Sequence, residues 1–131
     1  MKTIHVVAAV IKKDNKIFCC QRADTGPLAK KWEFPGGKIE EGENAKEALV
    51  REIREELDTE IKVEDLIMKV DHQYPTFRII LEAYLAEVIE GNLTLTEHLD
   101  AKWLGKDELK TLDWAEADIP IVDKIIKDIL I

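Results

Sequence analysis

The chain has 131 residues, of which 46% are hydrophobic and 35% are charged, and its formal net charge is −8. This composition predicts one folded domain spanning residues 1–131 and excludes an intrinsically disordered chain. The acidic balance excludes a protein that grips long nucleic acid through its phosphates, since such binding requires a basic surface. A small anionic substrate would need a bound cation to invert the local field.

The sequence also indicates where in the cell the protein is expected to be found. No apolar run approaches the roughly 20 residues that a membrane helix requires, and residues 1–5 lead into a strand-like segment without the features of a signal peptide. Cys19 and Cys20 are adjacent, so a strand would turn them to opposite faces, and there is no third cysteine to pair with either. We therefore expect a cytoplasmic protein with reduced thiols and no membrane partner.

The predicted elements begin with a β-hairpin. The β-branched run at residues 4–11 indicates a buried strand, a polar turn follows at 13–16, and residues 17–22 form the partner strand. A loop at 23–31 then leads to an extended segment at 32–34, because Pro35 biases its predecessor away from helix.

The second half predicts two longer helices around further strands. Asn44 and Glu47 have the spacing of a capping box, which predicts a helix from about Ala45 to Leu57. The remaining predicted elements are strands at 61–72 and 77–88, a turn at 91–92, a strand at 98–104, a short helix at 106–112 and a last helix at 119–130. This order predicts an α/β (α+β) fold, a mixed sheet with helices on both faces.

The helix predicted at 45–57 carries carboxylates in an unfavourable place. Glu52 and Glu56 lie beside the apolar stripe formed by Leu49, Ile53 and Leu57. Like charges four residues apart repel by roughly 0.2–0.5 kcal/mol, and the second half of a helix disfavours anions. A divalent cation would offset these terms, because clustered carboxylates are the hard oxygen ligands that Mg²⁺ prefers. A merely solvated acidic face is the alternative.

The same stretch resembles the Nudix box. Gly37, five residues, Glu43, seven residues and then Arg51-Glu52-Ile53-Arg54-Glu55-Glu56 match the family's pattern. The segments WEFPGGK at 32–38 and ADIP at 117–120 are similar to the MutT-type and CTP pyrophosphohydrolase branch. The resemblance spans nearly the whole chain and implies a Nudix-type α/β/α sandwich, with the box at about 37–59.

The chain departs from the pattern at the end of the box, where the family has Gly and an aliphatic residue. Here the two positions hold Asp58 and Thr59. A residue just after a helix often takes the left-handed conformation, which Gly adopts freely and Asp tolerates at some cost in stability. The implied metal ligands precede this point.

The resemblance implies the metal site and its catalytic residues. Glu52, Glu55 and Glu56 would coordinate Mg²⁺, which Mn²⁺ can replace, together with the backbone carbonyl of Gly36. Glu52 would act as general base on the attacking water, with Glu97 as the rival base or an extra ligand. Glu97 could equally be a solvated loop carboxylate.

Arg51 has a supporting part in the same interpretation. The family pattern gives it an orienting role toward Glu43 and the catalytic carboxylates, whereas its spacing from Glu55 also allows a simple ion pair.

The expected substrate-binding residues come from several segments. Glycines allow the backbone to approach phosphate closely, basic side chains hold phosphates, and an aromatic ring stacks on the base. A solvated strand end and a core-filling ring are the alternatives for the basic and aromatic positions. The residues are Arg22, Phe34, Gly36, Gly37, Lys38, Arg78 and Asp118.

Asp118 has two interpretations. It precedes the last predicted helix and could be its N-cap, whereas the resemblance implies that this position contacts the base. An ionised Asp only accepts hydrogen bonds, which suits the N4 amine of cytosine and favours a cytidine triphosphate without excluding 8-oxoguanine nucleotides. A raised pKa would remove this argument, because a protonated carboxyl donates.

The implied activity is magnesium-dependent nucleoside triphosphate pyrophosphohydrolysis, which yields the monophosphate and diphosphate. CTP, dCTP or an oxidised nucleotide such as 8-oxo-dGTP would be the substrate, in sanitation of the nucleotide pool. Tyr74 and Pro75 keep open ADP-ribose or a diadenosine polyphosphate as substrate, and a non-catalytic nucleotide-binding module is a further alternative. The expected partner is a small nucleotide, and the protein is expected to be a monomer or homodimer.

Overall fold

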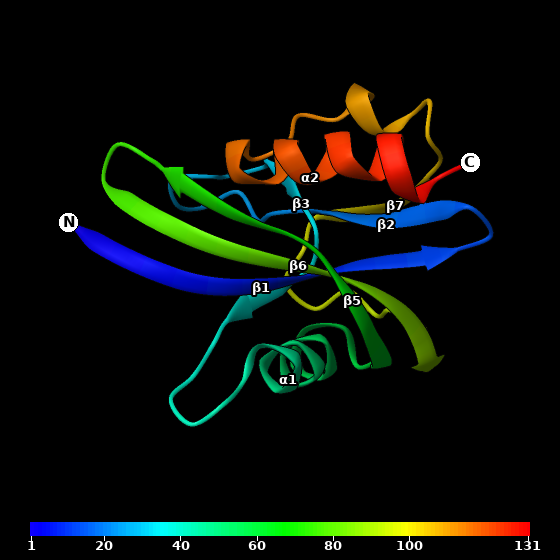
Figure 1. Ribbon diagram of the computed structural model, residues 1–131, viewed down its shortest axis with the longest axis horizontal. Helices are drawn as coiled ribbons and strands as arrows, with labels where there is room; N and C mark the ends of the chain where they lie inside the picture. The colour runs from blue at the N-terminus through cyan, green and yellow to red at the C-terminus, as the bar shows by residue number, and fades with distance from the viewer.

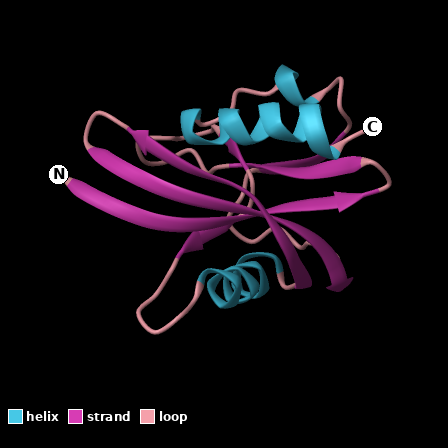
Figure 2. Cartoon of the chain, viewed as in Figure 1, coloured by secondary structure: helices cyan, strands magenta, loops and turns pink.

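A twisted mixed sheet runs through the molecule, with α1 on one face and α2 on the other (Figures 1 and 2). The computed structural model describes residues 1–131. Its strands are β1 (Lys2–Lys13), β2 (Lys16–Gln21), β3 (Trp32–Glu33), β4 (Gly36–Lys38), β5 (Glu60–Gln73), β6 (Phe77–Glu90) and β7 (Asp100–Leu104). Its helices are α1 (Ala45–Leu57) and α2 (Ile119–Lys124), which continues into a π-helical turn at Ile125–Ile129. The predicted fold class is confirmed.

β1 is the strand that joins the two halves of the sheet. It pairs in parallel with β6, and it pairs antiparallel with β2 and β4. Val7, Ala9 and Ile11 enter the core under α1, whereas Ala8 and Val10 enter the core under α2. Burial on both faces explains why the run is apolar without alternation.

α1 begins and ends where the sequence predicts. The Asn44 side chain accepts a hydrogen bond from the Glu47 amide, and the Glu47 carboxylate accepts one from the Asn44 amide, so the capping box is present. Asp58 ends the helix in the left-handed conformation, at φ 48° and ψ 46°. Both predictions for the helix ends are confirmed.

The structure differs from the predicted elements in four places. Gly36 and Gly37, which lie between the segment predicted at 32–34 and the helix predicted at 45–57, form β4 with Lys38 against β1. The helix predicted at 106–112 is a 3₁₀ turn at Leu109–Thr111, and the last helix changes to π geometry at Ile125. The strand predicted from residue 98 begins at Asp100, because His98 turns inward to Glu33.

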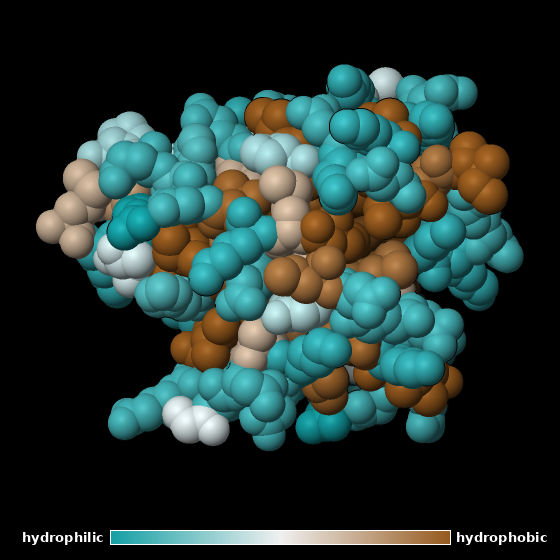
Figure 3. Space-filling model, in the orientation of Figure 1, coloured by the Kyte–Doolittle hydropathy of each residue, from teal (hydrophilic) through white to brown (hydrophobic).

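Polar residues cover most of the face seen in Figure 3, with apolar residues exposed between them. Among the helices, none is both long enough and apolar enough to span a membrane.

Candidate active site

Two glycines allow β4 to lie against its neighbours. A Cβ at Gly36 would overlap the backbone carbonyl of Val7 in β1, and a Cβ at Gly37 would overlap the carboxylate of Glu52 in α1. At Gly36 the obstacle is backbone and no side chain fits, whereas a side chain at Gly37 would have to displace the Glu52 carboxylate, so the requirement is close approach rather than a positive φ. The Glu52 carboxylate consequently lies directly over the Gly37 backbone.

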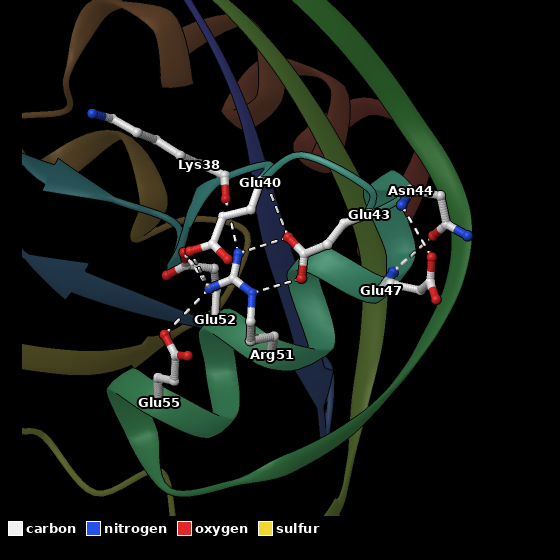
Figure 4. Close-up of polar contacts among 8 residues, drawn as sticks. All are labelled: Lys38, Glu40, Glu43, Asn44, Glu47, Arg51, Glu52 and Glu55. Carbon is white, nitrogen blue, oxygen red and sulfur yellow. Dashed lines mark hydrogen bonds and ion pairs between the residues drawn. The ribbon is translucent and has the colours of Figure 1, made fainter.

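Arg51 is the centre of the polar network on α1 (Figure 4). Its guanidinium donates to both oxygens of Glu43, at 2.6 and 2.9 Å, and to the carbonyl of Lys38 at 3.0 Å. Nη1 donates to Glu52 Oε1 at 3.0 Å and to Glu55 Oε2 at 3.2 Å. The hydrogen bonds to Glu43 and Glu52 raise the pKa of Arg51, and the bond from Arg51 lowers the pKa of Glu43. Arg51 therefore makes the contacts that both interpretations require. It binds Glu43 and Glu52, which it can orient, and it forms an ion pair with Glu55.

Glu56 is the carboxylate with the most perturbed environment on α1. Burial, together with the negative charges of Glu52, Glu33 and Glu97, raises its pKa to about 8. Burial also raises the pKa of Glu52, against the opposing effect of Arg51. Glu33 and Glu52 are paired with Arg22 and Arg51, whereas Glu56 itself makes no ion pair with a basic side chain.

The three carboxylates predicted as metal ligands do not all meet at one point. The Glu55 side chain is 60% exposed and is directed to Arg51, whereas the Glu52 side chain is 14% exposed. No three acidic, His or Cys side chains are grouped closely enough to hold a metal ion as they stand.

A cavity of about 720 Å³ opens on the α2 side of β4. Most predicted site residues line it, from segments well separated in the sequence: Arg22, Phe34, Gly36, Gly37, Lys38, Glu56, Glu97 and Asp118. Arg51, Glu52 and Glu55 do not line it, and Arg78 lies in a separate surface hollow, where it pairs with Asp71. The structure therefore brings together the predicted phosphate-binding and base-binding residues, except Arg78.

Glu33 and His98 also line the cavity, and neither was predicted from the sequence as a site residue. Glu33 accepts from Arg22 Nη1 at 2.9 Å through one oxygen and lies 3.2 Å from His98 Nε2 through the other. Arg22 Nε and His98 Nδ1 are buried without a hydrogen-bond partner. Two sequence features could have indicated these residues. Glu33 precedes Phe34 in the segment before the box, and His98 follows Glu97.

Asp118 does not cap α2 with its carboxylate. The side chain is instead buried and accepts a hydrogen bond from the backbone amide of Phe34 at 3.3 Å. Burial raises its pKa well above the usual value, and the charge of Glu33 adds to this effect. Asp118 thus stands at the N-cap position without capping the helix through its side chain, and its raised pKa removes the argument that rested on an ionised acceptor.

Phe34 is almost fully buried. Its ring packs against Trp114 with centroids 4.7 Å apart, which corresponds to the core-filling alternative, although the residue still lines the cavity. Tyr74, nearby in the same wall, accepts a hydrogen bond from the Ala117 amide through its hydroxyl at 3.0 Å. These contacts tie β3, the β5–β6 turn and the start of α2 into one wall.

The chain belongs to the Nudix family, whose NUDIX domain model matches residues 6–124. It is 38% identical to the CTP pyrophosphohydrolase of Escherichia coli strain K12, over 94% of this chain and 91% of that protein. It is 33% identical to the 8-oxo-dGTP diphosphatase of the same strain, over 95% and 98%.

Solved structures agree with this assignment. The solution structure of a MutT protein of the Nudix hydrolase family from methicillin-resistant Staphylococcus aureus 252 is 45% identical, with a TM-score of 0.80 over 98% of this chain and 99% of that one. The E. coli ORF135 protein is 37% identical, with a TM-score of 0.82 over 97% and 91%.

Nudix hydrolases as a class require a divalent metal ion, and the residues present fit one. Glu56 is buried among other carboxylates without a basic partner, and its raised pKa reports how poorly the site tolerates another negative charge. The available donors are carboxylate and backbone carbonyl oxygens, the ligand type of hard divalent cations.

Proposed function

We propose that the protein is a magnesium-dependent nucleoside triphosphate pyrophosphohydrolase that removes unwanted nucleotides from the pool. The observation that carries this proposal is the buried Glu56 carboxylate, which lies at the cavity wall with Gly36 and Gly37 and lacks a protein counter-ion. The names of the two E. coli relatives support the same reaction class, cleavage of a phosphorus anhydride.

Glu52, Glu56 and the Gly36 carbonyl would hold the Mg²⁺ ion, joined by Glu55 after its side chain turns away from Arg51. Mn²⁺ would fit the same oxygen ligands. When bound, the ion would supply positive charge that offsets the negative charge of the phosphates and of the leaving diphosphate. Arg51 keeps Glu52 oriented over Gly37 through its bonds to Glu43 and Glu52.

Glu97 is the better candidate for the general base. The sequence favoured Glu52, but one Glu52 oxygen accepts from Arg51 and the side chain lies behind Gly37, outside the cavity lining. Glu97 lines the cavity, is exposed, and has no ion pair, so its carboxylate is available to accept a proton from a water molecule.

Arg22 and Lys38 would hold the phosphates, because both are basic and both line the cavity. Glu33 accepts from Arg22 Nη1 only, which leaves Nη2 available for a phosphate oxygen. Arg78, paired with Asp71 in another hollow, has no part in this proposal.

Asp118 would contact the base as a neutral carboxyl. A protonated carboxyl offers one donor and one acceptor. Cytosine presents an acceptor and a donor at N3 and N4, and the guanine edge also presents both kinds of group, so this arrangement suits CTP, dCTP and 8-oxo-dGTP. UTP carries a carbonyl and an N–H at the corresponding positions, which a neutral carboxyl can also pair with, so Asp118 alone does not separate CTP from UTP.

The net charge and the reduced cysteines of the chain support a small nucleotide in the cytoplasm as the partner. The net charge of −8 opposes binding to long nucleic acid. Cys19 and Cys20 are both buried free thiols, which suits the reducing cytoplasm. We propose a cytoplasmic enzyme, active as a monomer or homodimer.

A substrate panel tests the proposal. CTP, dCTP, 8-oxo-dGTP, UTP, ADP-ribose and diadenosine tetraphosphate are each incubated with the protein, with and without Mg²⁺. We expect Mg²⁺-dependent turnover that is fastest for one of the first three nucleotides. Preference for ADP-ribose or the dinucleotide would move the substrate to another class, and binding without turnover of any compound would indicate a non-catalytic module.

A further inference from the structure

The loop between β6 and β7, residues 91–99, carries the proposed base Glu97 and is fastened to the end of α1. The Thr94 amide donates to the Leu57 carbonyl at 2.9 Å, and the Thr96 hydroxyl donates to the Glu56 carbonyl at 2.7 Å. These carbonyls belong to the last turn of the helix, where no intrahelical donor is available. The loop therefore supplies the donors that the end of α1 needs.

Thr59, just after α1, makes two further hydrogen bonds where the loop meets the end of the helix. It occupies the position where the box pattern has an aliphatic residue, and it is 2% exposed. Its hydroxyl donates to the Leu57 carbonyl at 2.9 Å and accepts from the Leu93 amide at 2.8 Å. Gly91 allows the close approach, since a Cβ there would lie 2.8 Å from the Asp58 carbonyl oxygen. A departure from the family pattern is thus used as a loop anchor.

Glu97 lies between two fixed neighbours in the chain. On one side Thr96 is bonded to the Glu56 backbone, and on the other His98 is held 3.2 Å from Glu33. Glu97 itself has no hydrogen bond or ion pair, and its side chain is exposed at the cavity. Its location therefore depends on the anchors rather than on contacts of its own.

We propose that Thr96 is a positioning residue for Glu97, acting through its hydroxyl bond to the Glu56 carbonyl. This bond ties the residue before Glu97 to the backbone of a predicted metal ligand, so it fixes the separation between the base and the carboxylate site. The inference rests on the proposed function, in which Glu97 removes a proton from water.

Three variants test the proposal. Thr96→Val keeps the shape but removes the hydroxyl, Thr96→Ser restores the hydroxyl, and Thr94→Val makes the same change two residues away, where only the backbone is bonded. We expect Thr96→Val to lower kcat about fivefold to tenfold with KM within about twofold, as one lost hydrogen bond would. Thr96→Ser and Thr94→Val should stay within about twofold of the wild type.

A readout independent of turnover accompanies the kinetics. The NMR order parameter of the Glu97 amide should fall in Thr96→Val and be restored in Thr96→Ser. Equal kinetics and equal order parameters in Thr96→Val and Thr94→Val would overturn the proposal, because the backbone bond of Thr94 would then suffice. If the wild type hydrolysed no nucleotide, the proposed function would fail, and the order parameters alone would decide whether Thr96 fixes the loop.

Discussion

The two walls of the cavity are built in different ways. The carboxylate wall comes largely from one helix, with Glu56 at the cavity and Glu52 and Arg51 behind it. The opposite wall joins Phe34 to Asp118, which are 84 residues apart in the chain. Burial raises the pKa of both Glu56 and Asp118, but Glu56 lies near further carboxylates that a cation would bind, whereas Asp118 accepts a hydrogen bond from a backbone amide. Residues close together in the sequence thus form the proposed metal site, whereas the proposed base-binding site depends on contacts between residues far apart in the chain.

The largest effect should follow from removing charge on the carboxylate wall. Glu56→Gln keeps the side-chain shape but removes a charged ligand, so we expect kcat to fall at least about 100-fold. The matched control is Glu41→Gln, at an exposed residue without side-chain hydrogen bonds, which should retain full activity. Steady-state kinetics at saturating Mg²⁺ measure both. Activity of Glu56→Gln within about threefold of wild type would remove Glu56 from the metal site.

A smaller effect is expected on the opposite wall. Asp118→Ala removes about two hydrogen bonds to the base, so kcat/KM for CTP should fall about 10- to 30-fold. Asp118→Asn also offers a donor and an acceptor and should stay within about threefold of wild type. A large loss in Asp118→Asn, equal to that in Asp118→Ala, would show that the carboxyl acts in its ionised form.

The stability of the metal-free protein should depend on pH through the buried carboxyls of both walls. Glu56 has a folded-state pKa of about 8 against an ordinary value of 4.5, so its favourable contribution is complete below about pH 4.5 and is lost as pH rises toward 8. We expect Tm to fall from pH 5 to pH 8, and to fall less in Glu56→Gln. Asp118→Asn should also flatten the curve, because the pKa of Asp118 is raised as well.

Added Mg²⁺ should separate the two walls in the same experiment. The ion should raise Tm at pH 8 in the wild type and in Asp118→Asn, but much less in Glu56→Gln, because it binds only the folded carboxylate site. An equal rise in Tm on adding Mg²⁺ in all three proteins would show that the ion does not bind at Glu56. It would contradict the division into a metal-binding wall and a base-binding wall.

The smallest effect is expected at the end of α1. Asp58 has a left-handed backbone and makes no side-chain hydrogen bond, so Asp58→Gly should raise the free energy of unfolding by about 0.5–1 kcal/mol. Chemical denaturation measures this change, and kcat should be unchanged. A loss of stability would mean that the entropy of Gly in the unfolded chain outweighs the relief of strain.

The sequence predicted the parts of the molecule that local rules determine. The capping box at Asn44 and Glu47, the left-handed Asp58 and the apolar face of α1 all depend on residues within a few positions of one another. The buried strand β1 was evident from its unbroken apolar run. The fold class followed from the order of such elements.

The parts that could not be predicted depend on distant neighbours. Nothing in the sequence around Asp118 shows that the Phe34 amide lies beside it, so the sequence left the helix cap open as an alternative to a contact with the base. Arg78 was expected to bind phosphate, but cross-strand pairing places it beside Asp71. The links of Glu33 to Arg22 and His98 likewise exist only after β2, β3 and the loop before β7 come together.

We propose that the protein hydrolyses a nucleoside triphosphate between the α- and β-phosphates with the aid of its carboxylate wall. Phosphorus NMR identifies the products formed from CTP and 8-oxo-dGTP with and without Mg²⁺. We expect nucleoside monophosphate and diphosphate in equal amounts, formed only when a divalent ion is present. Release of orthophosphate and a nucleoside diphosphate, or undiminished turnover in excess chelator, would contradict it.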